Sequence, residues 1–160
     1  MTFVHHRARR GEKTHRHEVR ERDCGEVITL DEYLDHWKVN YGYVRVPDDE
    51  LSEEIRREAQ VTVDRANALL GEFGEERPVN SGWRPLAVNR AIPGAALRSN
   101  HTRGMAIDLG DPDGDLDDWC MDHFDVLREL RLWLEHPAAT KGWCHVQTVA
   151  PKSWKRCFYP

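Results

Sequence analysis

The apolar residues of the chain recur at helical spacing in one long segment. From Pro47 to Gly71, charged residues alternate with an apolar stripe that would lie on one face of a helix. The stripe consists of Leu51, Ile55, Ala59, Val63, Ala66 and Leu70. Acidic residues crowd the first turn, where they suit the helix dipole, and Gly71 suits a C-terminal cap. The pattern therefore predicts an amphipathic packing helix that ends at Gly71.

Two further segments have helical patterns. Thr29 precedes a short run of apolar and acidic residues and is followed three positions later by Glu32, which is typical of a helix start. A weaker periodicity covers Leu116 to His136, and Pro137 would stop a helix there. We therefore expect a short helix after Thr29 and a longer helix over 116–136.

Short runs rich in aromatic and β-branched residues predict strands. These runs are Pro78 to Trp83, Met105 to Leu109 and Trp143 to Thr148. Helices ahead of a small sheet, with a further helix inserted, indicate an α+β domain. The expected architecture is a small antiparallel sheet flanked by helices.

Length and charge narrow the class of protein. The 160 residues suit one domain over 27–160, preceded by a basic, His-rich arm over 1–26 that we expect to be flexible. A net charge of −5 argues against a nucleic-acid partner. No apolar run approaches the roughly 20 residues that span a bilayer, and no apolar signal-peptide segment is seen, so we expect cytoplasmic synthesis and no membrane partner. The four cysteines form no CxxC pair, which leaves reduced thiols or, in an oxidising compartment, one or two disulfides.

The candidate chemistry lies around Gly104. His101 and Asp108 flank this glycine, and imidazole nitrogen and carboxylate oxygen are both ordinary zinc ligands. A catalytic zinc takes three protein ligands and leaves the fourth position to water, so a third ligand must come from elsewhere. The best candidate is His145, which lies in a strand-like segment. The alternative is that His101 and Asp108 simply hydrogen-bond to each other in the core.

An acidic loop follows the His-Asp motif. Its alternating aspartates from Asp111 to Asp118 resemble the start of a calcium loop, but an EF-hand needs glycine at position six and a bidentate Glu at position twelve. Counted from Asp111, position twelve is Asp122. A solvated turn followed by a helix with an acidic first turn explains the same composition, and no phosphate-binding glycine loop is present.

The motifs occur in an order that resembles a known family. In order along the chain they are Ser81-Gly82-Trp83-Arg84, Asn89, Ser99-x-His101-x-x-Gly104-x-Ala106-x-Asp108 and Trp143-x-His145. This order resembles the zinc D-alanyl-D-alanine carboxypeptidases and phage endolysin peptidases, which share their metal site with lysostaphin-type peptidases and the hedgehog signalling domain. The resemblance spans roughly residues 28 to 150 and implies a hedgehog/D-Ala-D-Ala peptidase-like fold. It also implies that His101, Asp108 and His145 bind Zn²⁺.

The resemblance implies a zinc metallopeptidase that hydrolyses peptidoglycan stem peptides, either at D-Ala-D-Ala or at L-Ala-D-Glu bonds. Arg84 would grip a substrate carboxylate through two parallel hydrogen bonds, with Ser99 assisting, unless Arg84 pairs with a surface acid instead. The segments Trp143 to Thr148 and Phe158 to Pro160 look most like those of phage-encoded members. That likeness implies an endolysin acting on the cell wall, or a component of a phage particle with other virion proteins as partners.

The general base departs from the family pattern. One branch of the family has a Glu three residues before the last ligand, where this chain has Gly142, and another has a second histidine where this chain has Gln147. Neither residue can accept a proton at useful pH, although Gln147 could hydrogen-bond the water. We expect Glu135 to act as the base. Other titratable side chains near the motifs are His136, Asp111, Asp113 and Asp115. The alternative is a catalytically impaired zinc-binding structural domain, such as a virion component.

Overall fold

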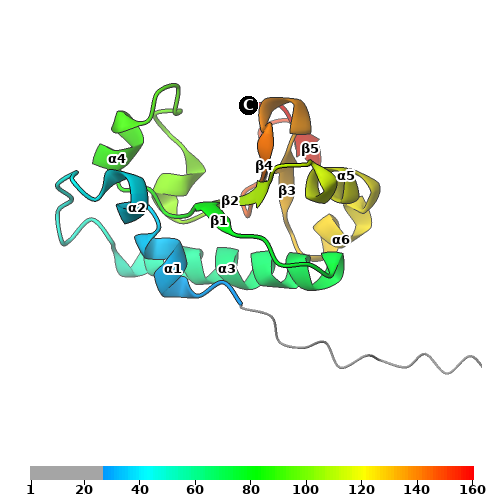
Figure 1. Ribbon diagram of the computed structural model, residues 1–160, viewed down its shortest axis with the longest axis horizontal. Coiled ribbons are helices and arrows are strands. Elements are labelled where there is room, and N and C mark those ends of the chain that lie inside the picture. The colour runs from blue at the N-terminus through cyan, green and yellow to red at the C-terminus, as the bar shows by residue number, and fades with distance from the viewer. Residues whose placement is uncertain (1–26) are drawn as a thin grey trace, which may run out of the picture.

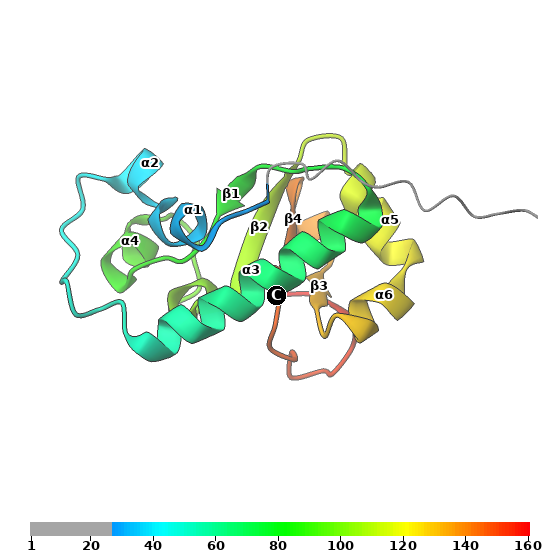
Figure 2. The same ribbon diagram turned by 90° about the horizontal axis from the view of Figure 1, so that it is seen from below.

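Helix α3 (Glu53–Phe73) forms the base of the protein in the computed structural model, which describes residues 27–160. The helix crosses beneath the sheet from one end of the molecule to the other (Figures 1 and 2). It begins where the Ser52 side chain accepts a hydrogen bond from the Ile55 N–H at 3.1 Å, later than the predicted start. The predicted cap at Gly71 is wrong, because the helix continues to Gly74, whose φ of +91° suits a C-cap. The additional turn lets Phe73 pack edge-on against a tryptophan of α5.

Three short helices form one end of the molecule, at the left of Figure 1. Helix α1 (Leu30–Asp35) begins as predicted, with the Thr29 side chain accepting from the Glu32 N–H at 3.1 Å. Helices α2 (Lys38–Tyr41) and α4 (Leu86–Ala91) lie near it. This end of the molecule provides the wall of a pocket described below.

The helix predicted over 116–136 is wrong in its second half. The segment contains α5 (Asp115–Asp122), α6 (Phe124–Glu129) and strand β3 (Trp133–Glu135). Helix α6 ends because Arg131 adopts a left-handed conformation, with φ of +53°, and the next N–H bonds back to the carbonyl of Leu127 at 2.9 Å. The apolar residues that follow Arg131, which fitted the face of a helix, enter the sheet instead.

A five-stranded sheet lies on α3, with strand order β1-β2-β4-β3-β5. The three predicted strands are present as β1 (Val79–Ser81), β2 (Ala106–Asp111) and β4 (Gly142–Gln147). Strand β3 and strand β5 (Cys157–Phe158) were not predicted. All pairs are antiparallel except β3 with β5, so the sheet is mixed rather than purely antiparallel. The α+β class is confirmed.

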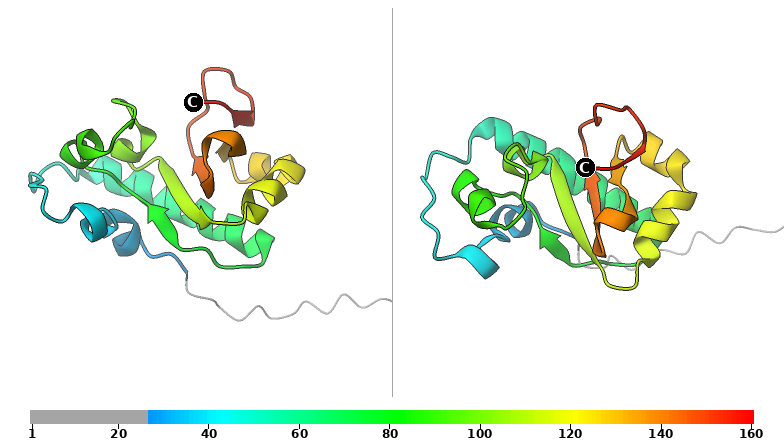
Figure 3. Two further views of the ribbon diagram at one scale, coloured as in Figure 1. Left: turned by 45° about the horizontal axis from the view of Figure 1, so that its top comes forward. Right: turned by 90° about the horizontal axis from the view of Figure 1, so that it is seen from above.

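The two faces of the sheet have different roles. On β2, Ile107 and Leu109 belong to the same buried cluster as Val63 and Leu69 of α3. Because side chains alternate along a strand, Asp108 lies on the opposite face. On that face, the loop after α4 and the segment between β4 and β5 both rise away from α3 (Figure 3). The polar face is therefore bordered by two loops.

The expected arm over 1–26, and Cys24 with it, lie outside the described residues. Within 27–160, Cys120, Cys144 and Cys157 are free thiols. No helix in this part of the chain is both long and apolar enough to cross a bilayer.

Candidate metal centre and adjoining pocket

Strand register brings three polar side chains into one row across the sheet. Asp108 of β2 is the register partner of His145 of β4. On the other side of β4, Glu135 of β3 places its Oε2 at 3.7 Å from His145 Nδ1. Glu135 in turn is the register partner of Phe158 in β5. Residues from four adjacent strands therefore meet on the polar face, although they are far apart in the sequence.

His101 reaches this row from a short 3₁₀ helix, η1 (Asn100–Arg103), that precedes β2. Gly104 ends η1 in the left-handed region at φ +73°, and a Cβ there would lie 2.9 Å from the carbonyl oxygen of Ile55 in α3. Glycine thus allows both the turn and the close approach of η1 to α3. The turn brings His101 and Asp108 to one place, with His101 Nε2 3.3 Å from Asp108 Oδ1.

The His101 ring is held in one orientation by the backbone. Its Nδ1 donates to the carbonyl of Gly82 at 2.8 Å, which leaves a lone pair on Nε2. A Cβ at Gly82 would lie 2.1 Å from the carbonyl oxygen of Tyr33, so this contact needs glycine. The Nε2 atom is buried and has no hydrogen-bond partner. Fixing one ring nitrogen through the other is how proteins orient a metal-binding histidine.

The His145 ring is fixed in a similar way by Gln147. The Nε2 of His145 lies 3.3 Å from Gln147 Oε1, which can only accept, so this nitrogen carries the proton. The Nδ1 then directs its lone pair at Asp108 Oδ1, 2.7 Å away. A lone pair that faces a carboxylate needs a proton or a cation between the two atoms. The arrangement is therefore suited to a bound cation.

His101, Asp108 and His145 together form a compact donor set. Their ligand atoms all lie within 4.8 Å of one another, and no other such His, Cys, Asp or Glu group occurs within the described chain. His101 Nε2 is 3.3 Å from the same Asp108 oxygen that His145 approaches. Two imidazoles and one carboxylate match the ligand set of catalytic zinc sites, which leave one position open.

The electrostatics of the cluster favour the protonation states in which Asp108 and His101 can bind a metal, which are the ionised carboxylate and the neutral imidazole. Burial would raise the pKa of Asp108, but His101 and His145 hold this pKa well below its usual range. Burial lowers the pKa of His101 despite the nearby carboxylate, which favours the neutral imidazole. Burial would also lower the pKa of His145, but the hydrogen bond with Asp108 raises it. A cation at this point would therefore displace a proton shared between His145 and Asp108.

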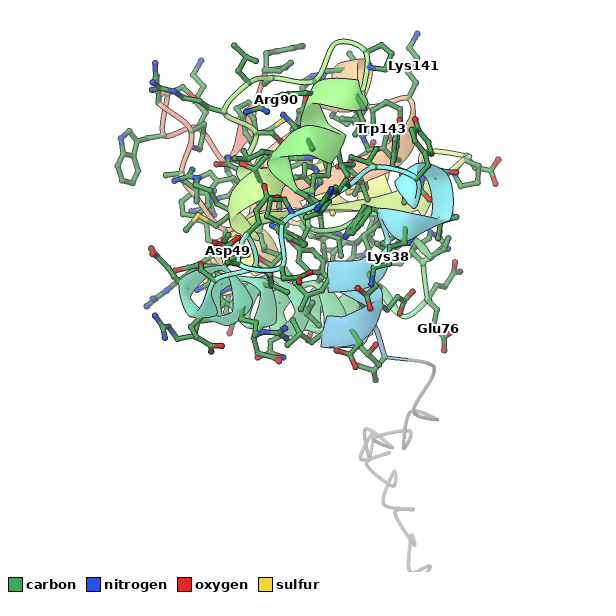
Figure 4. All side chains as sticks on the ribbon, turned by 90° about the vertical axis from the view of Figure 1, so that its left-hand side faces the viewer. Lys38, Asp49, Glu76, Arg90, Lys141 and Trp143 are labelled. Carbon is green, nitrogen blue, oxygen red and sulfur yellow. The ribbon has the colours of Figure 1, made fainter. Side chains whose placement is uncertain are left out.

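A cavity of about 400 Å³ adjoins the cluster on the side of β1. Asp108 and Arg84 line it together with Trp143 of β4 and residues of α1–α2 such as Tyr41. In the view of Figure 4, which faces this end of the molecule, Trp143 lies between the ribbons of α4 and α2. The α1–α2 wall was not predicted, because no motif marks it in the sequence, and Trp143 was named only as part of the Trp143-x-His145 motif, without a place in a cavity.

Arg84 lies at the boundary between the cavity and the cluster. Its Nη2 is 3.8 Å from Asp108 Oδ2, and its Nη1 donates to Asn89 Oδ1 at 3.4 Å. Its Nε is buried without a partner. Burial lowers the pKa of Arg84, while the charge of Asp108 opposes this shift. The structure places Arg84 against the cluster rather than in a pair with a surface acid.

The remaining predicted residues lie elsewhere. Ser99 caps η1, where its Oγ accepts from the His101 N–H at 3.3 Å, and it does not line the cavity. His136 stacks on Tyr159 at 4.2 Å between ring centres. Asp111 accepts hydrogen bonds from the first backbone N–H groups of α5, at 2.9 and 3.1 Å. Asp111 thus caps α5, which agrees with the alternative to a calcium loop, and Asp115 pairs with Arg77 at 3.0 Å.

Glu135 is the acid that the structure brings to the cluster. The sequence placed it at the end of a helix, and that placement is wrong, because Glu135 lies on a strand. Its side chain is 17% exposed, and burial raises its pKa although His145 opposes the shift. Trp133, two residues before Glu135, is the register partner of Gln147 in β4. An aromatic residue at this spacing was the signal for a strand that the sequence offered.

Comparison with known proteins gives one family. Residues 28–123 match the family described as Peptidase M15. The matched segment includes Arg84, His101 and Asp108 and ends before β3 and β4, which carry Glu135 and His145. No curated protein and no solved structure gives a significant match.

Proposed function

The chain belongs to the peptidase M15 family of zinc peptidases, and we propose that it hydrolyses peptidoglycan stem peptides with zinc held by His101, Asp108 and His145. The observation that carries this proposal is the orientation of the two rings. Each imidazole is held through one nitrogen and directs the other toward Asp108. A core hydrogen bond between His101 and Asp108 alone does not require this arrangement.

Zinc, when bound, supplies a Lewis acid that polarises the scissile carbonyl and lowers the pKa of water. Glu135 supplies the base in our proposal. Its Oε2 lies 3.7 Å from His145 Nδ1, on the side of His145 opposite β2, so it borders the ring nitrogen that would bind the metal. Burial raises the pKa of Glu135, which brings a carboxylate closer to the range in which it can both take and return a proton.

Gln147 has a different role in this proposal. An amide does not titrate, but Gln147 Oε1 accepts from His145 and also from Asn100 Nδ2 at 3.1 Å. Its own Nε2 donates to the carbonyl of Val149 at 2.7 Å, which fixes the direction of the amide. Gln147 therefore positions His145 and compensates for the family histidine that it replaces, while Glu135 takes over the proton.

Arg84 and the cavity provide the substrate-binding side. The cavity of about 400 Å³ is large enough for an amino-acid residue beside the scissile bond. The guanidinium of Arg84 is held by Asn89 and directed toward Asp108, and it can grip a substrate carboxylate. Such a grip suits the terminal carboxylate of D-Ala-D-Ala or the carboxylate of a D-Glu residue. In this scheme Ser99 assists indirectly, through the backbone of His101.

Two functions on this fold remain to be separated by experiment. The first is a phage-related D-Ala-D-Ala carboxypeptidase or L-Ala-D-Glu endopeptidase that acts on the cell wall. The second is a zinc-binding structural domain, such as a virion component, and it is favoured by the replacement of the family base positions by Gly142 and Gln147.

The experiment uses purified protein with stoichiometric zinc and muropeptides that contain either bond. We expect fragments from one of the two bonds, and loss of both zinc and turnover in His101→Ala. The matched control is His136→Ala, which removes a histidine outside the cluster and should keep zinc and activity. Zinc binding with no turnover on either bond would favour the structural domain, and absence of zinc binding would rule out both functions.

A further inference from the structure

A basic surface lies around the segment that connects β4 to β5. Six basic side chains contribute, from three parts of the chain: Arg65 of α3, Arg128 and Arg131 at the end of α6, and Lys152, Lys155 and Arg156 before β5. We call these six residues the basic face. Within residues 27–160, none of the ion pairs involves any of them.

Direct contacts hold the three parts together. Arg65 Nη1 donates to the carbonyl of Arg131 at 3.0 Å, although the two residues are far apart in sequence. Arg156 Nη1 donates to the carbonyl of the next residue, Leu132, at 2.8 Å. The Arg156 guanidinium also lies over the Trp133 ring, 4.4 Å from its centre. These backbone acceptors neutralise no charge, so the guanidinium groups keep their full positive charge at the surface.

The charges of the basic face act on one another. Burial lowers the pKa of Arg65, and the charge of Arg131 lowers it further, while Glu58 offsets part of this effect. Burial likewise lowers the pKa of Arg156, and the charge of Arg128 adds to the shift. The protein as a whole carries a net charge of −5, so this concentration of cations is not a consequence of composition. An anion bound here would relieve the repulsion.

An exposed tryptophan projects from the same segment. Trp154 lies between Lys152 and Lys155, and 77% of its surface is exposed. Its φ of +56° is unusual for a bulky side chain, and its N–H donates to the carbonyl of Pro151 at 2.9 Å. A large ring held in solvent by a strained backbone is a feature expected of a contact residue.

Both ends of this segment contact the candidate metal centre. The segment leaves the sheet after Gln147, which holds His145. It returns in β5, where the ring of Phe158 packs edge-on against His145 with 6.5 Å between ring centres. Figure 3 shows this segment rising from the sheet on the side away from α3. A polymer bound along it would lie beside the metal centre, on the side opposite the cavity.

We infer that the basic face, with Trp154, binds a phosphate-bearing polyol or sugar polymer and holds it beside the metal centre. Four of the six cations are arginines, whose planar guanidinium binds phosphate through paired hydrogen bonds. The indole offers an apolar surface to the carbon skeleton between the phosphates. The inference does not depend on peptidase activity, because it concerns binding alone.

The test measures fluorescence anisotropy of labelled poly(glycerol phosphate) with the zinc-loaded protein at low and high salt. Lys152→Glu combined with Lys155→Glu should weaken binding about tenfold or more and reduce the slope of log K against log salt by roughly 0.7 for each lost contact. Trp154→Ala should weaken binding by a factor that changes little with salt. Thermal melting of each variant confirms that it is folded.

The matched control is Lys38→Glu combined with Arg90→Glu, which makes the same charge change on the face seen in Figure 4. It should change the affinity less than twofold. Equal weakening by this control would overturn the inference, because net charge alone would then explain binding. Equal binding of poly-L-glutamate would refute the phosphate assignment, and much tighter binding of single-stranded DNA would make the face a nucleic-acid site instead.

Discussion

Asp117→Asn should stabilise the protein at neutral pH but not in acid. Asp117 lies on α5 and is 4% exposed. Its Oδ2 accepts from Thr140 Oγ1 at 3.5 Å, and its Oδ1 is buried without a partner. Burial, followed by the charges of Asp111 and Asp118, raises its pKa to about 6, although the Cys144 thiol donates a hydrogen bond to it. The ionised form of this carboxylate is therefore destabilised by the fold.

The magnitude follows from the pKa shift. The ordinary pKa of this group is 3.8, and the shift to about 6 corresponds to roughly 3 kcal/mol. Below pH ~4 the carboxyl is protonated in both the folded and the unfolded states, and the penalty is absent. As the pH rises from ~4 to ~6, the unfolded state ionises first, so stability falls, and above ~6 the full penalty remains. An amide does not ionise, so Asp117→Asn should gain up to about 3 kcal/mol above pH 6 and little below pH 4.

Urea unfolding of the wild type and Asp117→Asn, measured from pH 4 to pH 8 at one fixed zinc concentration, tests this reasoning. Zinc binding contributes equally to the free energy of unfolding of both proteins. Asp117 contacts Cys144, which lies on the face of β4 opposite to the candidate ligand His145. Asp122→Asn, an exposed change at the end of the same helix, is the control and should change the free energy of unfolding by less than about 0.5 kcal/mol. A difference between wild type and Asp117→Asn that stays constant across the range, or a variant less stable at pH 8, would refute the argument.

The remaining predictions concern the metal centre. Glu135→Gln should lower kcat by about 10²- to 10⁴-fold while zinc content is unchanged, and retained turnover would exclude Glu135 as the base. Gln147→Leu should weaken zinc affinity by about 10- to 100-fold in a chelator competition, because the His145 ring loses its acceptor; unchanged affinity would contradict this role. Gly104→Ala should lower the free energy of unfolding in urea by about 1 to 3 kcal/mol, because φ is +73° and a Cβ would meet the backbone of α3. An unchanged free energy of unfolding would show that η1 can shift. Arg84→Lys should raise KM more than it lowers kcat, and an unchanged KM would argue against a carboxylate grip.

The sequence determined those features that depend on local pattern. The stripe of α3, the cap at Thr29 and three of the five strands were predictable, because side-chain periodicity and capping act over a few residues. The ligand candidates were also visible, since His101 and Asp108 share one motif around Gly104. The family match over 28–123 is consistent with that motif.

Tertiary structure decided the end of α6 and the place of Glu135. The apolar residues after Arg131 fit a helix face as well as a strand, and the choice depends on whether β4 and β5 are available to pair with them. That pairing joins segments far apart in the chain, and periodicity contains no information about it. The pairing of β3 with β4 brings Glu135 beside His145, which the pairing of β2 with β4 aligns with Asp108. The acid beside the candidate metal centre was therefore determined by register rather than by motif.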